Sequence, residues 1–514
     1  MGEDLRITPS DREDRSIATG AVQGASILTV SFLVVGILGY IFNILLSWLL
    51  PVEQYGGFGV AVALFGITGL FVNVGFPWAV TKFISAETHL IKQYKIFKSA
   101  IVGNILTAVL LSIVLVVVFS FPPVQVVIEK KLGLLLIVTL LLSSSIAVHL
   151  NTLQGLFRFK QLGGMQILQA GVRTVAGFTF AFLGYGALGA FAGYFVAAIV
   201  AQIIVTYLLR NFKFWQAPGW IDAKIYTFAP AMFLSFLGIT LLSNMDLLGV
   251  RFISEITVSE ELTGYYQSIL IIARVPFVIT GAMMMAIFPF ISKFADSDSQ
   301  IYPSTALKYA SLFVFPVSIM IAIYPSTFIT LLFPDSYIAG ANALRVIAVG
   351  MAFLSIIQVL AYIFQALGKP WTPAILLVIL SMVQLGILLV LVPRWGLVGG
   401  AVATTVSCFL GVLFLLTKYR ALKRVKIQLV PILKFLMILG ILGYVGFLIE
   451  LENGIWMMVF LVIAAVMYVF LLLLLRLVDE NDINIIGGIL PSNKFTHTMI
   501  TKVRSFAVRL NEIR

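Results

Sequence analysis

Three ionisable side chains lie inside long apolar stretches of the chain. Arg173 and Arg274 have mainly apolar neighbours, and Asp246 stands five residues before Arg251. A guanidinium group pairs bidentately with phosphate oxygens, so the two arginines indicate a cationic cleft that receives an anionic group. A structural interpretation stays open beside it, in which Asp246 neutralises one of the arginines.

The apolar stretches are long enough to carry these residues across a membrane. A spanning helix needs roughly 20 apolar residues, and backbone groups in lipid must be satisfied within the helix. The sequence therefore predicts an all-α polytopic membrane protein with about fourteen transmembrane helices. The expected spans are 26–50, 59–84, 99–121, 132–156, 164–184, 188–209, 226–250, 265–291, 306–333, 342–367, 371–392, 397–417, 429–449 and 455–475.

The composition excludes a soluble globular protein. Hydrophobic residues make up 61% and charged residues 11% of the 514 positions, against about 45–50% and roughly 25% in soluble domains. The single cysteine, Cys408, allows no disulfide framework. The net charge of +12 indicates basic cytoplasmic loops rather than nucleic-acid binding.

The distribution of basic residues predicts the orientation. The two tails and the loops on one side, with the adjoining span ends, hold 26 of the 34 Lys and Arg residues, and the opposite side holds 5. Because basic loops stay in the cytoplasm, both termini are expected there. Residues 1–25 form an amino-terminal tail unlike a cleavable signal peptide, and 476–514 form a carboxyl-terminal tail with a basic amphipathic helix.

An internal repeat divides the spans into two lobes. Gln154-Gly-Leu-Phe-Arg-Phe-Lys160 leads to Tyr185-Gly-Ala-Leu-Gly-Ala190, as Gln365-Ala-Leu-Gly-Lys369 leads to Trp395-Gly-Leu-Val-Gly-Gly-Ala401. We expect an amino-terminal lobe at 26–209, a carboxyl-terminal lobe at 226–417, and two extra helices at 429–475. Parallel repeats of this kind leave a cleft between lobes, which rock to open it on alternate sides.

These motifs resemble the polysaccharide transporter family of the multidrug/oligosaccharidyl-lipid/polysaccharide exporter superfamily. The resemblance implies a flippase of the cell membrane that moves a lipid-linked oligosaccharide to the outer leaflet. It implies membrane lipid and glycan assembly enzymes as partners, and no nucleic acid. The motifs that carry it are Gly39-Tyr-Ile-Phe-Asn43, Gln54-Tyr-Gly-Gly-Phe58, Asn73-Val-Gly-Phe-Pro77, Leu332-Phe-Pro-Asp-Ser-Tyr337, Ala343-Leu-Arg345, Gln365-Ala-Leu-Gly-Lys369 and Gly396-Leu-Val-Gly-Gly-Ala401.

The resemblance also suggests substrate-binding residues. Related lipid II flippases line their cavity with basic residues from helices 1, 2 and 8, and only Arg274 matches that pattern. The expected substrate contacts are therefore Arg274 and Arg173, with Asn43 on helix 1 and Asn73 on helix 2. In those relatives an extra helix pair makes a groove for the isoprenoid tail, although plain packing is an equal alternative here.

Some relatives bind sodium through helices 7, 11 and 12. Asp246 and Thr404 match two of these positions, and helix 11 offers Ser381 and Gln384. Sodium or proton coupling through Asp246 and Thr404 is thus a hypothesis, with no other cofactor or metal expected.

Two rival functions remain. A glycosyltransferase needs carboxylates on the outer face, whereas the Asp296-Ser-Asp298 motif falls in a cytoplasmic loop, so the chain is not expected to be an enzyme. A cation-coupled multidrug exporter of the same superfamily is the alternative. It usually has carboxylates in the amino-terminal lobe, and spans 1 to 6 carry none at mid-span.

Overall fold

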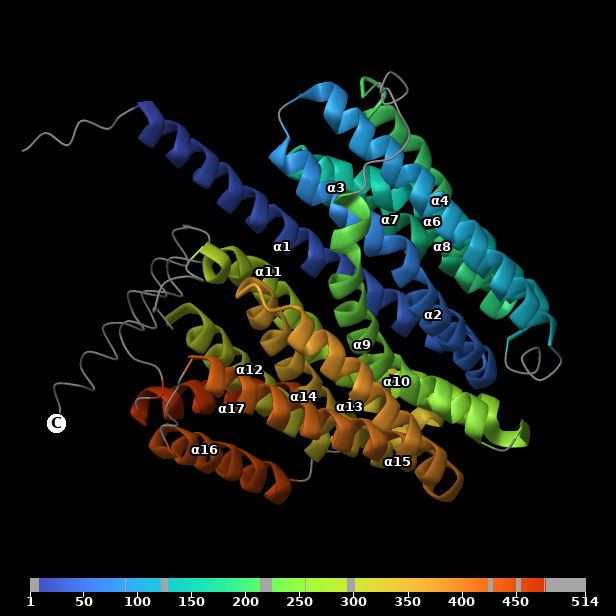
Figure 1. Cartoon of the computed structure of the whole chain (residues 1–514). Helices are drawn as coiled ribbons and strands as arrows, with labels where there is room; N and C mark the ends of the chain where they lie inside the picture. The colour runs from blue at the N-terminus through green and yellow to red at the C-terminus, as the bar shows by residue number, and fades with distance from the viewer. Residues whose placement is uncertain are drawn as a thin grey trace, which may run out of the picture.

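The computed structural model is built of helices (Figure 1). It describes residues 9–87, 89–121, 128–212, 224–254, 256–293, 301–423, 429–449, 454–475 and 477. The helices are α1 (Pro9–Leu49), α2 (Val52–Asn73), α3 (Gly75–Ala86), α4 (Leu90–Ser120), α6 (Lys130–Gly155), α7 (Phe159–Phe180), the π-helical turn η1 (Ala181–Tyr185), α8 (Gly186–Leu208), α9 (Lys224–Ile253), α10 (Ile256–Ala273), α11 (Val275–Lys293), α12 (Ile301–Ile323), α13 (Pro325–Leu332), the 3-10 helix η3 (Asp335–Gly340), α14 (Ala341–Ala366), α15 (Trp371–Lys423), α16 (Leu429–Leu448) and α17 (Gly454–Leu474).

The described part of the chain contains ten apolar segments that could cross a membrane, two of them long enough to cross twice, and two shorter apolar helices. Nine apolar segments are long enough to cross, and α10 with α11 makes a tenth that is bent by 43°. Two of the nine, Phe159–Leu208 and Trp371–Leu422, have 50 and 52 residues, more than twice the length that one crossing needs. Each of these two is broken in the middle, and α16 and α17 add two further apolar helices. The predicted fold class is confirmed.

Two breaks within spans lie at prolines. α3 starts at Gly75 with Pro77 in its first turn, and α11 starts at Val275 with Pro276 in its first turn. Proline is tolerated in the first turn of a helix because the amide hydrogen it lacks has no partner there. The chain therefore bends before these prolines and continues as a new helix.

The internal repeat is visible in the backbone at the second pair of motifs. Gly186 stands 32 residues after Gln154, and Gly396 stands 31 residues after Gln365. Their φ values are 55° and 51°. A left-handed backbone favours glycine. Both glycines turn the chain sharply between consecutive crossings, so the two motifs form the same elbow.

The first pair of motifs also folds alike. Phe157 and Gly368, three residues after Gln154 and Gln365, have φ values of 56° and 71°. Both helix ends close in the same way: the Arg158 amide donates to the Leu153 carbonyl, and the Lys369 amide to the Phe364 carbonyl, each at 2.9 Å. This is the Schellman pattern of helix termination, repeated once in each half.

The two halves of the chain pack as separate groups of helices and meet along α1, α2 and α3 on one side and α9, α10 and α11 on the other. α2 and α10 run side by side (Figure 1) and approach most closely at two glycines. A Cβ on Gly56 would lie 2.6 Å from the backbone nitrogen of Gly264, and one on Gly264 would lie 2.2 Å from the carbonyl oxygen of Val52. We call this contact the glycine crossing.

The glycine crossing marks the axis that relates the halves. Gly56 also meets the Glu260 carbonyl, as Gly264 meets that of Val52. Such reciprocal contacts are typical of a twofold relationship. The next turn breaks the symmetry, because Gly59 faces the side chain of Gln267.

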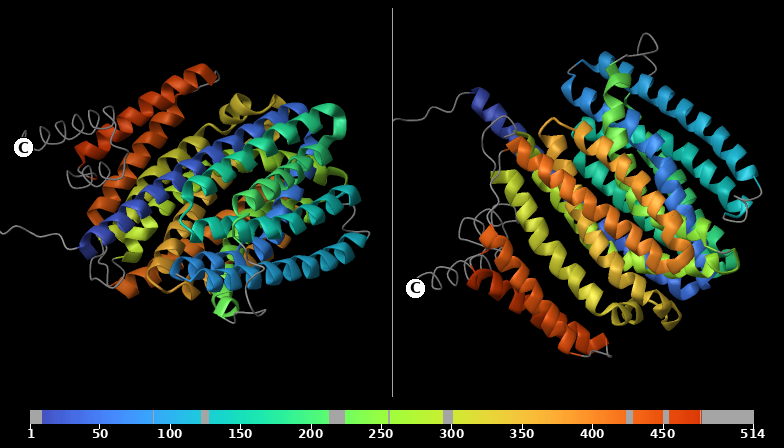
Figure 2. Two further views of the ribbon diagram at one scale, coloured as in Figure 1. Left: turned by 90° about the horizontal axis from the view of Figure 1, so that it is seen from above. Right: turned by 60° about the horizontal axis from the view of Figure 1, so that its bottom comes forward.

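The two extra helices lie at the edge of the bundle beside α12 (Figure 2). The Tyr324 hydroxyl donates to the Gly446 carbonyl at 2.6 Å, and the Tyr468 hydroxyl to the Leu312 carbonyl at 2.5 Å. Lys434 donates to the carbonyl of Leu475 at 3.1 Å. The two tyrosine bonds hold α16 and α17 against the helices of the carboxyl half, and the lysine bond joins the two extra helices to each other.

Some expectations agree with the structure, and others are not tested by it. The first predicted span, 26–50, agrees with the apolar segment Ile27–Leu49, and α1 continues beyond it toward the amino terminus as far as Pro9. The predicted amphipathic helix and the Asp296-Ser-Asp298 motif lie outside the described residues. The exact limits of the tails, lobes and extra pair stay predictions.

Candidate functional site

A polar cavity of about 330 Å³ lies inside the amino-terminal group of helices. Gln166, Gln169 and Arg173 reach it from one face of α7, since residues three and four apart lie together on a helix. Asn73, the last residue of α2, lies beside the cavity, and α6 contributes the hydroxyl groups of Thr139 and Ser143. The full lining is Phe32, Val35, Phe65, Asn73, Thr139, Ser143, Ile146, Ala147, Leu150, Gln166, Gln169, Ala170, Arg173, Tyr194, Ala197 and Ala198. We call it the amino-lobe cavity.

Arg173 is held in this cavity by an aromatic ring. Its guanidinium carbon lies 5.0 Å from the centre of the Tyr194 ring, within the range of cation–π attraction. Its Nε is buried and has no hydrogen-bond partner among the described residues. The cavity therefore contains a positive charge that no protein carboxylate among its lining residues balances.

Asp246 and Thr404 meet in a buried cluster, although they come from α9 and α15. The Thr404 hydroxyl and the Tyr266 hydroxyl both donate to Asp246 Oδ2 at 3.1 Å, and the Leu247 amide donates to Oδ1 at 2.9 Å. Gln384 donates to the Thr404 hydroxyl at 2.8 Å. The side chains of Asp246, Tyr266, Gln384 and Thr404 have no solvent exposure. We call these four residues the Asp246 cluster.

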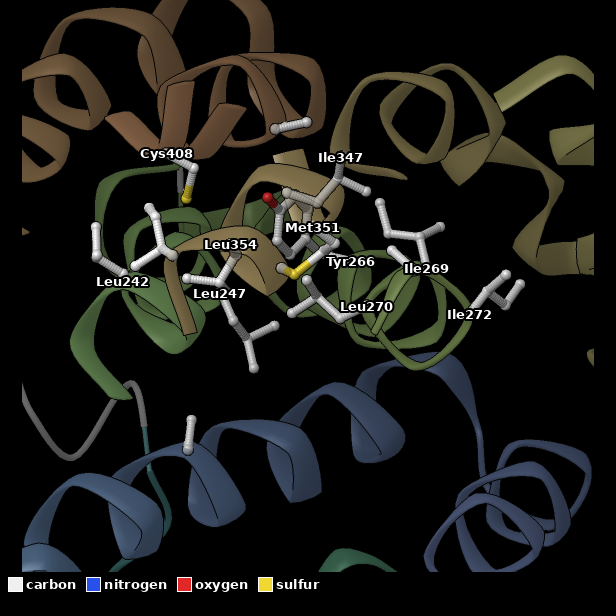
Figure 3. Close-up of a cluster of buried hydrophobic side chains, with 14 of the residues drawn as sticks. Leu242, Leu247, Tyr266, Ile269, Leu270, Ile272, Ile347, Met351, Leu354 and Cys408 are labelled. Carbon is white, nitrogen blue, oxygen red and sulfur yellow. The ribbon is translucent and has the colours of Figure 1, made fainter. Parts of the chain in front are cut away.

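Apolar side chains surround the Asp246 cluster. Figure 3 shows Tyr266 packed among Leu247, Met351 and Leu354, with Cys408 nearby. In such surroundings a carboxylate is stable either beside a cation, when it is ionised, or in its protonated, neutral form. The Oε1 of Gln384 is buried and unpartnered within the described chain. The carboxylate of Asp246 and the hydroxyl oxygens of Thr404 and Tyr266 therefore gather in one place, and oxygen ligands are the kind that a small hard cation prefers.

Arg274 occupies the bend between α10 and α11. Its guanidinium donates to the Ser243 carbonyl and, at 3.3 Å, to Asn244 Oδ1, both on α9. Asp246 and Tyr40 are close enough to interact electrostatically with it, but no ion pair within 4.0 Å joins Asp246 to Arg274 in the described part of the chain. Arg251 pairs instead with Glu260 at 2.6 Å. Asp246 therefore acts on Arg274 through the electrostatic field rather than through a direct ion pair, and its neutralisation of that arginine stays a hypothesis.

Asn43 lies near the glycine crossing rather than in the amino-lobe cavity. Its amide nitrogen donates to the Gly39 carbonyl at 2.9 Å, and its Oδ1 accepts from Tyr55 and Gln267, each at 3.5 Å. Gln267 is on α10, so Asn43 connects the two halves. Of the four expected substrate residues, the structure brings only Arg173 and Asn73 together.

An apolar groove of about 500 Å³ lies on the side of the extra helices. Its walls come from α10, the first residue of α11, α12, α13, α16 and α17, and α1 contributes Tyr40. The lining includes Leu312, Pro316, Leu442, Leu461 and Val469. α1 thus borders both cavities, with Phe32 and Val35 on the polar one and Tyr40 on the apolar one.

Three residues of these sites were not singled out from the sequence. Tyr266 and Gln267 follow Gly264 on α10, and Tyr194 follows Gly193 on α8. Tyrosine and glutamine are common in packed helix interfaces, so their types gave no signal. Their distance from Gly264 or Gly193, both close-approach glycines, is the one feature that could have indicated them.

Two lobes of apolar helices, with a polar cavity inside one and a buried carboxylate inside the other, define a polytopic membrane protein. The family described as "Polysaccharide biosynthesis protein" matches residues 21–295. The chain belongs to this family.

A curated relative and several solved structures are similar to the chain. An uncharacterized membrane protein of Methanocaldococcus jannaschii is 28% identical over 102 residues, and the match covers only 20% of each protein. The lipid II flippase MurJ, in an inward closed conformation, aligns with a TM-score of 0.66 and 16% identity over 86% of this chain and 97% of that one.

Two other transporters share the architecture as well. A Vibrio cholerae MATE transporter aligns with a TM-score of 0.57 and 15% identity over 80% of this chain and 98% of its own. A MOP superfamily transporter from Pyrococcus furiosus aligns with a TM-score of 0.57 and 16% identity over 78% of this chain and 96% of its own. At these identities the likeness shows a common fold.

Proposed function

We propose that the protein is a flippase that moves a lipid-linked oligosaccharide or polysaccharide repeat unit from the cytoplasmic to the outer leaflet. The observation that carries the proposal is that one helix, α1, borders both a polar, arginine-bearing cavity and an apolar groove. A lipid-linked glycan has a polar head and a long apolar tail. The head matches the first site and the tail matches the second.

The positive charges suit the phosphate that joins lipid and glycan. Arg173 in the amino-lobe cavity and Arg274 at the α10–α11 bend are the two candidate phosphate contacts. Phosphate accepts charge-assisted hydrogen bonds from guanidinium groups. Arg274 now donates to Ser243 and Asn244, and it would exchange these bonds for phosphate oxygens during transport.

Alternating access requires that each end of the bundle opens in turn. With both tails in the cytoplasm, the glycine crossing and the adjacent Asn43–Gln267 contact lie toward the outer surface. Separation of α2 from α10 would open the outer side. In this orientation the protein is a multi-pass protein of the cell membrane whose substrate enters from the cytoplasmic leaflet.

The Asp246 cluster is the candidate energy-coupling site. Asp246, Thr404 and the unpartnered Gln384 oxygen would hold sodium, or Asp246 alone would take a proton. Either event neutralises a buried charge and changes the packing of α9 against α15. Coupling to the gradient of that cation would then drive the transport cycle in one direction.

The alternative, a cation-coupled multidrug exporter, is disfavoured by the charge of the amino-lobe cavity. Its lining contains Arg173 and no carboxylate. A cationic drug would meet repulsion there, whereas an anionic head group would be attracted.

Purified protein in proteoliposomes tests the two functions directly. A fluorescent lipid-linked oligosaccharide is placed in both leaflets, and a membrane-impermeant quencher reports the fraction that changes sides. Flippase activity predicts loss of the protected fraction with wild-type protein and a slower loss with Arg274→Ala. Transport of a cationic dye without movement of the lipid-linked glycan would instead establish the exporter.

A further inference from the structure

We infer that the amino-lobe cavity is a subsite for a sugar phosphate, namely the sugar of the lipid-linked glycan that is bonded directly to phosphate. The inference rests on the proposed function and adds to it the part of the substrate that is recognised. It assigns the phosphate to Arg173 and the sugar hydroxyls to the amides of Asn73, Gln166 and Gln169.

The first argument is the state of the amides. No hydrogen bond from the side chains of Asn73, Gln166 or Gln169 to another described residue occurs, and all three border the cavity. Amide groups inside a membrane protein are normally bonded to a neighbouring helix or to backbone. Asn104 is the contrast within the same lobe, because it donates to the carbonyls of Val72 and Ser144 at 2.8 and 2.7 Å.

The second argument is chemical matching. An amide both donates and accepts hydrogen bonds, and so does a sugar hydroxyl. Ser143 and Thr139 donate to carbonyls of their own helix, which leaves their oxygens as acceptors toward the cavity. Aromatic rings of Phe32 and Phe65 provide apolar surface for the C–H groups of a sugar ring.

The third argument is charge and size. Arg173 has an unpartnered Nε and no carboxylate beside it in the cavity lining, so one anionic group is accommodated. The volume of about 330 Å³ is at the lower end of the range of small-ligand pockets, roughly 300–1,000 Å³. It suits one sugar with its phosphate rather than a whole oligosaccharide.

Binding of soluble sugar phosphates to the full-length protein in nanodiscs tests the subsite. The probes are the 1-phosphates of glucose, galactose, mannose and N-acetylglucosamine, with inorganic phosphate and the free sugars as comparisons. We expect at least one sugar 1-phosphate to bind tighter than inorganic phosphate and than its free sugar. Failure of all four to bind wild-type protein would overturn the inference.

Variants separate the two halves of the subsite. The double change Gln166→Leu and Gln169→Leu should weaken sugar 1-phosphate binding about tenfold and leave inorganic phosphate within about twofold. Arg173→Gln should weaken both. The control is Gln202→Leu on α8, an amide outside the cavity that donates to Thr206. Equal losses in the control, or normal binding in the double variant, would contradict the assignment.

The same variants distinguish this inference from the proposed function. If wild-type protein flips the lipid-linked glycan and the double amide variant flips it equally fast, the subsite is wrong and the flippase stands. If sugar phosphates bind as expected but wild-type protein flips no lipid-linked glycan, the subsite stands and the flippase is wrong.

Discussion

The hydroxyl of Thr404 donates a hydrogen bond of 3.1 Å to the carboxylate of Asp246, although 158 positions separate the two residues. The bond joins α15 to α9 inside the carboxyl-terminal group of helices. Both side chains are fully buried, so water does not compensate the charge of Asp246. How this charge is balanced depends on Thr404 and its neighbours.

Removing the Thr404 hydroxyl should therefore alter ion coupling. Thr404→Val keeps the shape of the side chain and removes one oxygen from the cluster. If sodium is the coupling ion, we expect the sodium concentration needed for half-maximal flipping to rise about tenfold, the scale on which groups around an ion site act. If a proton is the coupling ion, we expect the proton concentration needed to fall, because the lost hydrogen bond had favoured the ionised carboxylate. The measurement is the flipping rate in proteoliposomes against sodium concentration and pH.

Thr405→Val is the matched control for this change. Thr405 is the next residue, but its hydroxyl donates to the carbonyls of Ala401 and Val346 at 2.8 and 3.1 Å, away from Asp246. It should leave the ion dependence unchanged. Asp246→Asn should abolish the dependence on both cations, and an Asp246→Asn protein with the wild-type ion response would remove the coupling role.

Arg274 should act on substrate rather than on folding alone. Arg274→Ala removes charge-assisted hydrogen bonds of about 1.5–3 kcal/mol, so we expect flipping to fall roughly 10- to 100-fold. Arg274→Lys keeps the positive charge but lacks the planar guanidinium group. Its flipping rate should lie between those of wild type and Arg274→Ala. Flipping rates are compared at equal amounts of folded protein.

A second arginine separates loss of charge from loss of structure. Arg345 donates to the Ala322 carbonyl at 3.2 Å and is exposed, so Arg345→Ala removes a similar side chain from the same half of the protein. Near-normal flipping is expected. Equal losses in both alanine variants would mean that Arg274 has no special role with the substrate.

The sequence predicted the crossings and the repeat because both depend on local order along the chain. Apolar length determines a span, and Gly186 and Gly396 stand at matching distances from Gln154 and Gln365. The grouping of side chains from distant helices depends instead on helix rotation. Asn43 and Asn73 were both expected at the substrate, yet Asn43 lies beside Gln267 and Asn73 borders the amino-lobe cavity.

The Asp246 cluster was easier to anticipate than the cavity. A carboxylate in an apolar span must have partners. The residue type alone therefore marked Asp246 as a candidate. Amides such as Gln166 and Gln169 are tolerated at many helix contacts, and nothing in their spacing indicates whether a neighbouring helix will satisfy them. Their unpartnered state is a property of the packed helices.

The repeated elbow should contribute to stability at both positions. Gly396 has φ of 51°, and a Cβ there meets no heavy atom within 4 Å. Gly396→Ala thus isolates the backbone strain, for which we expect a loss of about 1–3 kcal/mol. Gly186→Ala should lose more, because its Cβ would lie 2.3 Å from Gln54 Oε1. Thermal unfolding of the purified protein measures both.

The control for the elbow is Gly171→Ala on α7, a helical position where a Cβ has open space. Alanine favours a helix over glycine by roughly 0.5–1 kcal/mol, so this variant should be slightly more stable than wild type. If Gly396→Ala unfolded at the temperature of Gly171→Ala, the left-handed elbow would not be required.

The glycine crossing should control closure of the proposed outer side. In Gly56→Ala the new Cβ would lie 2.6 Å from the Gly264 nitrogen, so α2 and α10 must separate for the side chain to fit. A bias of about 1.4 kcal/mol changes the ratio of open to closed protein tenfold.

Ser143→Cys, in the amino-lobe cavity, reports opening through its labelling rate with an impermeant maleimide added outside. The native cysteine, Cys408, is buried and does not compete. We expect labelling about tenfold faster in the Gly56→Ala background and no change with Gly57→Ala, whose Cβ would meet nothing within 4 Å. Equal labelling in the two backgrounds would show that this contact does not hold the outer side shut.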